Sequence, residues 1–216
     1  MSYRLLTKKL LIANKKFVTR KELREYCKTL KITYESAISY LLSNKYVERT
    51  FRGIFYVKSI EERKLGISNM TFFEVMKEAM KIKGIPCWYF GLESALKLNN
   101  LTHEYFTIEF IVSEKIRRPK PIEILGHKVR FLAIKKSLTA FGINKEPFPY
   151  SDTEKTILDI AYFGIYRGLS KYAIKNNLVD YVEKCNRKKL LKYAENYPKS
   201  VLILINSIKN DKKRSY

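Results

Sequence analysis

The residues of this chain that could carry out chemistry are few and widely spaced. A metal-dependent nuclease needs a carboxylate and an acidic-x-Lys pair on a strand, so that the metal ion and the base face one phosphate. The sequence contains two such triplets, Glu62-x-Lys64 and Asp211-x-Lys213. The first falls in a charged segment typical of a linker and the second in the charged C-terminal tail. Because neither is expected on a strand, a nuclease-like defence protein is a less favoured alternative.

Other catalytic signatures are missing from the sequence. It contains no GxxxxGK[ST], GxSxG or HExxH motif, and no Gly-Ser turn followed by the spaced aspartates of a nucleotidyltransferase. The two histidines, His103 and His127, each stand beside an expected turn. The three cysteines, Cys27, Cys87 and Cys185, lack CxxC spacing, which argues against a zinc site or a disulfide framework and favours a reducing compartment. We predict no enzymatic activity, no metal and no cofactor.

The charge of the chain is its most unusual property. Among 216 residues, 43 lysines and arginines stand against 21 aspartates and glutamates, a formal net charge of +22. Such an excess favours a polyanionic partner, with nucleic acid ahead of an anionic membrane surface. The alternative is the codon bias of an A/T-rich genome, which enriches lysine. The N-terminus lacks the apolar core of a signal peptide, and no apolar stretch approaches the roughly 20 residues of a membrane span. We expect a cytoplasmic protein without a membrane segment.

The first 60 residues have the pattern of three helices followed by a strand hairpin. Thr19 stands three residues before Glu22, the capping-box spacing that satisfies free backbone N–H groups at a helix start. The segments "YVERTF" and "GIFYV" alternate like strands about Arg52-Gly53, where glycine permits the positive φ of a tight turn. Two helices joined by a short turn and followed by a two-stranded wing make a winged helix-turn-helix.

In such a unit the second helix of the motif enters the major groove of DNA. Burial of the apolar residues on the helix from Tyr34 turns polar and stacking side chains outward, while basic residues on either side are placed to neutralise phosphates. The alternative is a protein-interaction module with a solvated basic face. We predict that double-stranded operator DNA is bound by Arg20, Lys21, Tyr34, Glu35, Ser36, Ser39, Tyr40, Lys45, Arg49 and Arg52.

The whole sequence predicts an α+β protein with two domains. The winged helix-turn-helix covers residues 1–60, a Gly/Ser/Asn-bearing linker covers 61–70, and a C-terminal domain covers 71–216. Within the last, 71–150 has a mixed α/β pattern and 151–216 is mainly helical. Both domains are basic, so binding of DNA or RNA by the C-terminal domain is a further hypothesis. A palindromic operator would favour a homodimer on DNA.

Three segments in order resemble the AbiEi antitoxins of abortive-infection systems, across roughly residues 1–165. "ERTFRGIFYV" is similar to their R-x-x-R-G-(I/V)-Y segment, and "CWYFGLESALKLNNLT" (87–102) resembles their S-A-L-x-x-h-G-L segment. "YSDTEKTILDIAYFG" (150–164) resembles their x-x-E-K-(T/A)-(L/I)-L-D helix. Asn99-Asn100 stands where many members carry His-Gly. The resemblance implies the antitoxin of a type IV toxin–antitoxin pair, which represses its own operon through the winged helix. Its C-terminal domain would counter a nucleotidyltransferase-like toxin without a stable complex. A free-standing winged-helix transcriptional regulator is the competing class.

The resemblance marks Ser94, Glu154, Lys155 and Asp159 as the antitoxin-domain motif, and their bottom-up interpretation is structural. Ser94 is expected at the surface, Glu154 as part of a capping box with Ser151, and Lys155 pointing outward. Asp159 stands among apolar residues, and a buried carboxylate needs a cation, for which we expect Arg130 or Arg167. Asp159→Ala should therefore destabilise the protein by more than the ~0.5 kcal/mol of a typical surface change.

Overall fold

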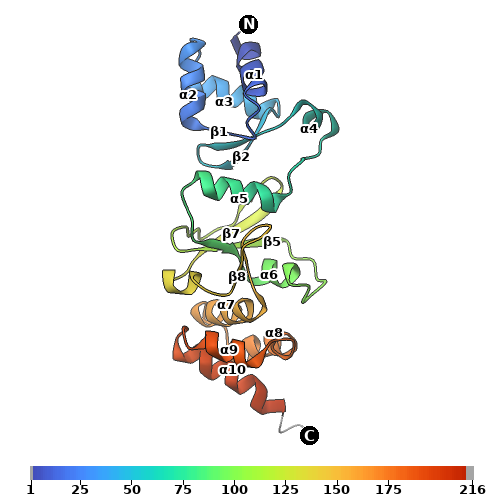
Figure 1. Cartoon of the computed structure of the whole chain (residues 1–216), viewed down its shortest axis with the longest axis vertical. Helices are drawn as coiled ribbons and strands as arrows, with labels where there is room; N and C mark the ends of the chain where they lie inside the picture. The colour runs from blue at the N-terminus through green and yellow to red at the C-terminus, as the bar shows by residue number, and fades with distance from the viewer. Residues whose placement is uncertain (1, 213–216) are drawn as a thin grey trace. The chain divides into compact units, whose positions relative to one another are not determined.

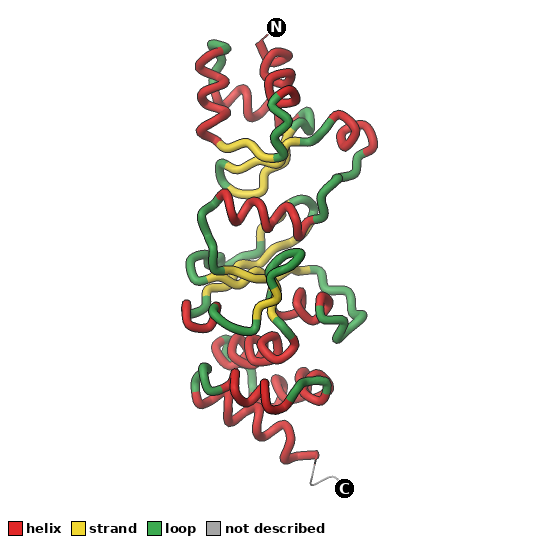
Figure 2. Tube along the Cα trace, viewed as in Figure 1, coloured by secondary structure: helices red, strands yellow, loops and turns green. Residues whose placement is uncertain are grey.

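The computed structural model describes residues 2–212, which form helices and two β-sheets (Figure 1, Figure 2). The prediction of an α+β chain is confirmed. The chain divides into two compact units. The first extends to Pro86 and includes the short segment Glu123–His127, and the second comprises Cys87–Ile122 and the chain from Lys128 onward.

The first unit extends to Pro86 and includes the short segment Glu123–His127. Its elements are, in order, α1 (Ser2–Ile12), β1 (Phe17–Thr19), α2 (Arg20–Thr29), α3 (Tyr34–Ser43), β2 (Val47–Phe51), β3 (Ile54–Val57), α4 (Ile60–Leu65) and α5 (Phe72–Ile82). The strands form an antiparallel sheet of order β1-β3-β2. The expected capping box of Thr19 and Glu22 starts α2. The β2–β3 hairpin turns at Arg52-Gly53, since Phe51 pairs with Ile54 and Gly53 has a φ of +82°.

The segment expected to be a linker is partly helical. Ser59 and Glu62 form a second capping box, which starts α4 inside residues 61–70. The following helix α5 packs on β2 and β3, so it belongs to the first unit and not to the C-terminal domain expected from residue 71. Its amphipathic face buries Val75, Met76 and Ala79, which explains why the unit extends to Pro86.

The second unit begins with strands and ends in helices. Its elements are, in order, β4 (Trp88–Phe90), α6 (Leu92–Leu98), β5 (Ile108–Ser113), β6 (Ile122–Ile124), β7 (His127–Ala133), the 3₁₀ helix η1 (Lys136–Thr139), β8 (Ile143–Asn144), β9 (Tyr150–Ser151), α7 (Thr153–Tyr166), α8 (Lys171–Glu183), α9 (Arg187–Ala194) and α10 (Lys199–Lys212). The division between the units falls within β6, after Ile122. The sheet is mixed, with the order β6-β7-β5-β4-β9-β8. Strand β5 runs parallel to β7 and antiparallel to β4, and β4 runs parallel to β9.

Helix α7 is the centre of this unit. It packs against α6 and β9 on one side and against α8, α9 and α10 on the other (Figure 1). One apolar core joins the layers, from Val112 on the sheet through Leu158 on α7 to Leu178 and Leu204 on the outer helices. A side chain on the buried faces of α7 is therefore enclosed on several sides.

The charged tail lies only partly within the described chain. Residues 209–212 continue α10, whereas 213–216 and the complete Asp211-x-Lys213 triplet fall outside the described residues. Glu62 of the other acidic-x-Lys triplet lies on a helix. Every helix between residues 2 and 212 is too short or too polar to cross a membrane. No group of three or more His, Cys, Asp or Glu side chains in this range is arranged to hold a metal ion.

Candidate nucleic-acid interface

The outer face of α3 consists of small polar groups. Ala37 and Leu41 are buried in the core of the first unit, and this turns Glu35, Ser36 and Ser39 to the solvent. The exposed serines have short side chains, which permit close approach of another macromolecule at their positions. Hydroxyl groups both donate and accept hydrogen bonds, which suits them to base edges as well as phosphates.

Arginines surround the start of α3. The guanidinium groups of Arg20 and Arg24, both on α2, lie 5.2 Å and 5.5 Å from the ring centre of Tyr34. The structure thus brings together Arg20 and Tyr34, two of the predicted residues, and adds Arg24, which the sequence analysis did not select. The Nε atom of Arg20 is buried and has no hydrogen-bond partner among the described residues.

Tyr40, another of the predicted residues, packs against two other tyrosines. Its ring stacks on Tyr3 with centroids 4.9 Å apart and on Tyr46 with centroids 6.0 Å apart. The guanidinium of Arg63 then lies over Tyr46 at 3.5 Å. Tyr40 is half-buried in this row, so it fixes α3 against α1 and the hairpin.

The hairpin presents two exposed arginines, Arg49 and Arg52. Its turn is tied to the helices, because the backbone N–H of Arg20 donates to the carbonyl of Gly53 at 2.7 Å. A methyl group at Gly53 would lie 3.2 Å from the Cβ of Arg20, so glycine permits this approach as well as the positive φ. The other two predicted basic residues, Lys21 and Lys45, are exposed on α2 and after α3.

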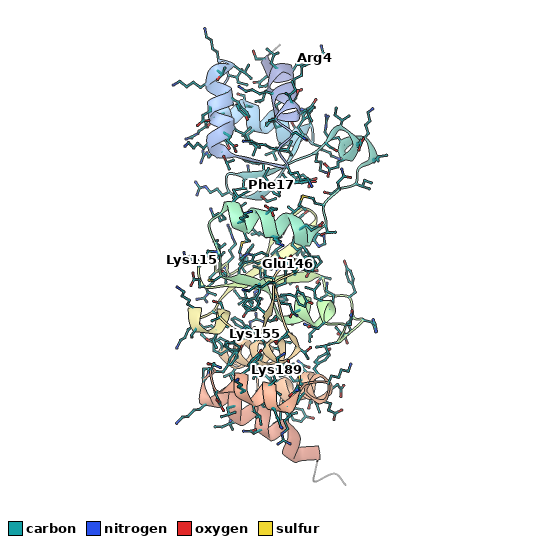
Figure 3. The ribbon with its side chains drawn as sticks, viewed as in Figure 1. Arg4, Phe17, Lys115, Glu146, Lys155 and Lys189 are labelled. Carbon is teal, nitrogen blue, oxygen red and sulfur yellow. The ribbon has the colours of Figure 1, made fainter. Side chains whose placement is uncertain are left out.

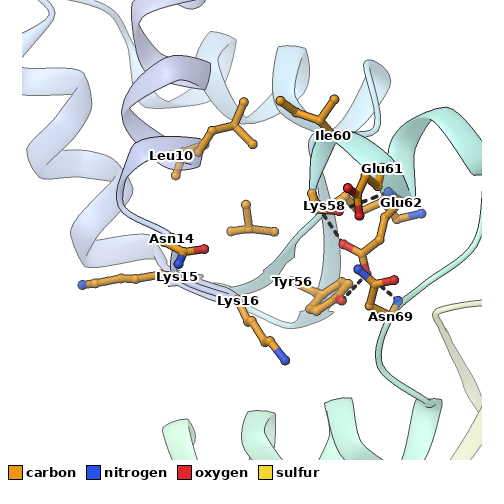
Figure 4. A pocket seen from close by; sticks show the side chains of 13 residues that line it. Leu10, Asn14, Lys15, Lys16, Tyr56, Lys58, Ile60, Glu61, Glu62 and Asn69 are labelled. Atoms are coloured by element: carbon orange, nitrogen blue, oxygen red, sulfur yellow. Dashed lines mark hydrogen bonds between the residues drawn. The ribbon is translucent and has the colours of Figure 1, made fainter.

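The first unit contains a cavity of about 430 Å³, and Glu62, which lines it, has a structural role (Figure 4). On one side it is lined by Glu62, whose carboxylate accepts from the Tyr56 hydroxyl at 2.5 Å, from the Asn69 backbone at 2.6 Å and from the Ser59 backbone at 2.7 Å. Burial, together with the hydrogen bond to Glu62, raises the pKa of Tyr56 to about 12. Through these hydrogen bonds, the Glu62 carboxylate holds α4 and the chain after it beside β3.

Two residues of the antitoxin-domain motif form a buried ionic cluster in the second unit. Lys155 and Asp159 have no exposed surface, and the Lys155 ammonium lies 3.3 Å from the carboxylate of Asp159 (Figure 3 labels Lys155). Asp159 also accepts hydrogen bonds from the hydroxyls of Tyr89 at 2.8 Å and Tyr197 at 2.6 Å. Asp159 thus has a cationic partner, as predicted, but this partner is Lys155, and the expected partners Arg130 and Arg167 were wrong.

The outward orientation expected of Lys155 is also wrong. Its ammonium donates to the Tyr197 hydroxyl at 3.0 Å and lies 4.8 Å and 4.9 Å from the ring centres of Tyr89 and Phe141. Burial lowers the pKa of Lys155, against the opposite effect of Asp159. Burial, and then the charge of Asp159, raise the pKa values of Tyr89 and Tyr197 well above the usual 10.0. The four side chains of the cluster are thus enclosed within the second unit.

The other two motif residues differ from their expected roles. Ser94 is buried and not at the surface: its hydroxyl donates to the carboxylate of Glu109 and accepts from the backbone N–H of Phe110 at 2.8 Å. Glu154 does not cap α7. It accepts from the backbone N–H of Asn186 at 2.9 Å and pairs with Lys189 at 2.8 Å.

The capping residue of α7 is Asp152, whose side chain accepts from the backbone N–H of Lys155 at 2.9 Å. Ser151 belongs to β9 and its hydroxyl bonds to that of Thr156 at 2.7 Å, so the expected Ser151–Glu154 capping box is absent. Ser151 and Glu154 thus have capping-box spacing in the sequence, but Asp152, one position after Ser151, is the N-cap residue of α7.

The comparisons with known proteins support the fold of the chain. No protein-family model matches the sequence, and no curated protein matches it. Among solved structures, the crystal structure of the RV2827C protein from Mycobacterium tuberculosis is similar, with a TM-score of 0.61 at 13% sequence identity. The alignment covers 95% of this chain and 75% of the other. At this identity, the likeness shows a shared fold.

Proposed function

We propose that the first unit is a winged helix-turn-helix that binds double-stranded DNA. The observation that carries the proposal is the succession of α2, α3 and the β2–β3 hairpin, with exposed serines on α3 and exposed arginines on the hairpin. The element order α1-β1-α2-α3-β2-β3, with the sheet order β1-β3-β2, supports the assignment of α3 as the helix that enters the major groove. The hairpin is then the wing.

The side chains divide by their role in this proposal. Ser36 and Ser39 on α3 contact base edges, because small hydroxyl groups allow the helix to lie deep in the groove. Arg49 and Arg52 of the wing neutralise phosphates, which sets affinity and register without reading sequence. Glu35 stands in the first turn of α3, where it favours the helix N-terminus or accepts from a cytosine amino group.

We further propose that the second unit is the antitoxin domain of a type IV toxin–antitoxin pair. The support is the resemblance of two segments, which form one packed substructure: Phe90 of β4 pairs with Tyr150 of β9, and α6 packs on α7. The Asn99 side chain joins them further, because it donates to the carbonyl of Ser151 at 2.8 Å. This substructure would counter a nucleotidyltransferase-like toxin without a stable complex.

DNA binding is tested by fluorescence anisotropy of the full chain. The probes are the DNA upstream of its own gene and a scrambled duplex of equal length, at several salt concentrations. We expect tighter binding to the first, with an affinity that falls steeply with salt. Equal, weak binding to both duplexes would mean that the net charge of +22 causes only nonspecific attraction to DNA.

The antitoxin function is tested by co-expression with the product of a neighbouring nucleotidyltransferase gene. Rescue of growth supports the antitoxin, and a chain that represses its promoter but gives no rescue is a free-standing regulator. Binding as a homodimer is tested in the same DNA experiment by the stoichiometry at saturation.

A further inference from the structure

Arginines converge on a second cavity, which lies entirely in the second unit. This cavity of about 400 Å³ is bordered by the chain after β5, by β7 and by the end of α7. Its lining contains Arg117, Arg118, Arg130 and Arg167 together with Lys135, and no aspartate or glutamate. The volume is in the range of sites for small molecules.

The arginines of this cavity are not neutralised by close carboxylates. Within residues 2–212, none of the four forms an ion pair within 4 Å. The Nε atoms of Arg118 and Arg130 are buried and have no hydrogen-bond partner among the described residues. A buried N–H without a partner is costly, so these donors favour a ligand that accepts hydrogen bonds.

Their positions are fixed by the surrounding fold. The backbone N–H of Arg118 donates to the carbonyl of Phe131 at 3.1 Å, which holds the loop after β5 beside β7. The guanidinium of Arg167 lies 6.0 Å from the ring centre of Phe110 and 5.9 Å from that of Phe163. Arg118 is therefore held by a backbone bond and Arg167 by aromatic rings.

One carboxylate lies near the arginines without lining the cavity. Glu93 on α6 interacts electrostatically with Arg130 and Arg167, and its Oε2 atom is buried without a hydrogen-bond partner among the described residues. Burial raises the pKa of Glu93, although both arginines act in the opposite direction. One carboxylate cannot balance four guanidinium groups, so the cavity retains a positive charge.

The same cavity has an aromatic wall. Tyr162 and Tyr166 stack with ring centroids 6.4 Å apart and planes 19° apart. Tyr166 is 65% exposed, so a surface of its ring is accessible to a ligand. A planar base can stack on such a ring, as bases do on aromatic side chains in other nucleic-acid-binding proteins.

We propose that this cavity binds a nucleotide, with its phosphate against the arginines and its base on Tyr166. Guanidinium groups bind phosphate oxygens through paired hydrogen bonds, which a converging set of arginines can supply from several directions. The site goes beyond the proposed DNA binding, because it lies in the other unit and uses none of the α3 or wing residues. The ligand is either a free nucleotide or the phosphorylated end of an RNA strand, which share this chemistry.

The test is isothermal titration of the full chain with AMP, adenosine, inorganic phosphate and tripolyphosphate. We expect AMP to bind, adenosine not to bind, and inorganic phosphate to compete with AMP at higher concentration. A tetranucleotide RNA with a 5′-phosphate that binds more tightly than AMP indicates an RNA end, and equal binding indicates a free nucleotide.

Two variants with equal loss of charge separate the site from general attraction. Arg117→Gln/Arg167→Gln should weaken AMP binding by about tenfold or more, since each removes a charge-assisted hydrogen-bond donor. The control Arg187→Gln/Lys188→Gln changes exposed residues of α9 outside the cavity and should leave the affinity unchanged. Arg117 is exposed, so Arg117→Gln alone provides a folded variant if the double one melts early.

The aromatic wall is tested separately. Tyr166→Leu should weaken AMP binding but not the competition by inorganic phosphate. Absence of AMP binding at millimolar concentration, or an equal loss in the control variant, would overturn the site. Tripolyphosphate binding more tightly than AMP, with no effect of Tyr166→Leu, would overturn the assignment of a nucleotide.

Discussion

Lys155 lies one helical turn before Asp159, and the two side chains meet at 3.3 Å without any exposed surface. They are enclosed by the hydroxyls of Tyr89 and Tyr197, which come from β4 and from the loop before α10. A buried ion pair is favourable only when hydrogen bonds satisfy its remaining atoms, and the two tyrosines do so here. This cluster joins the strands of the second unit to its C-terminal helices.

Removal of both partners should destabilise the protein by less than the sum of the two single removals. We expect Lys155→Met to lower the free energy of unfolding by about 3–5 kcal/mol, because it leaves a buried carboxylate without its cation. Asp159→Asn should also destabilise the protein, and the double variant should lose less than the sum of the two. Urea unfolding of the four proteins gives the coupling energy.

The exposed Lys171→Met on α8 is the matched control, for which we expect a change within about 0.5 kcal/mol. Strict additivity of the Lys155 and Asp159 substitutions would show that the two side chains do not interact in solution.

Gly142 should tolerate no side chain, because it packs directly on the buried cluster. Its φ is +64°, and a Cβ atom would lie 2.9 Å from both the Cβ of Lys155 and a ring carbon of Tyr193. Gly168 has a similar φ of +77° with open space around it. Gly142→Ala should therefore lower the melting temperature more than Gly168→Ala, which has only the backbone strain of about 1 kcal/mol. Equal shifts would mean that strain alone matters.

Glu154 should make the stability of the second unit fall at acidic pH. Burial would raise the pKa of Glu154, but hydrogen bonds from Lys189 and the Asn186 backbone outweigh it and lower the pKa below 4.5. The ionised form is thus favoured in the folded protein. Its contribution is present above the pKa of the unfolded chain and is lost as the pH falls through the folded value.

Glu154→Gln should therefore be less stable than the wild type at neutral pH, and its melting temperature should fall less below pH 4.5. The exposed Glu104→Gln provides the control and should follow the wild-type profile. An identical acid dependence in Glu154→Gln and the wild type would exclude this carboxylate as a source of acid sensitivity.

Local signals predicted local structure well. The Thr19–Glu22 capping box and the Arg52-Gly53 turn are both where the sequence placed them, since each depends on residues at most three positions apart. The helix inside the expected linker was missed although Ser59 and Glu62 have the same capping-box spacing, because the composition of residues 61–70 is typical of a linker. Glu62 is buried because Tyr56 and the backbone of Asn69 bind it.

The partners of buried polar groups could not be predicted from the sequence, although the burial of Asp159 could. A lysine is almost always exposed unless it is paired, so Lys155 was placed outside. Its surroundings come from Tyr89, Phe141 and Tyr197, which no local pattern connects to it. The arginine-lined cavity was missed for the same reason: the Arg117-Arg118 pair is visible in sequence, but its proximity to Arg167 follows from the tertiary fold.

If α3 reads DNA sequence as proposed, the chain binds the upstream duplex more tightly than the scrambled one, and the ratio of the two affinities measures this directly. Ser36→Ala/Ser39→Ala should lower this ratio by about fivefold or more, because lost base contacts reduce discrimination. Arg49→Gln/Arg52→Gln should instead weaken both duplexes alike and reduce the salt slope by about 2.

The charge-matched control Lys81→Gln/Lys83→Gln, at exposed positions at the end of α5, should change neither quantity. A wild-type ratio near one, or a ratio that the serine substitutions leave unchanged, would contradict the account.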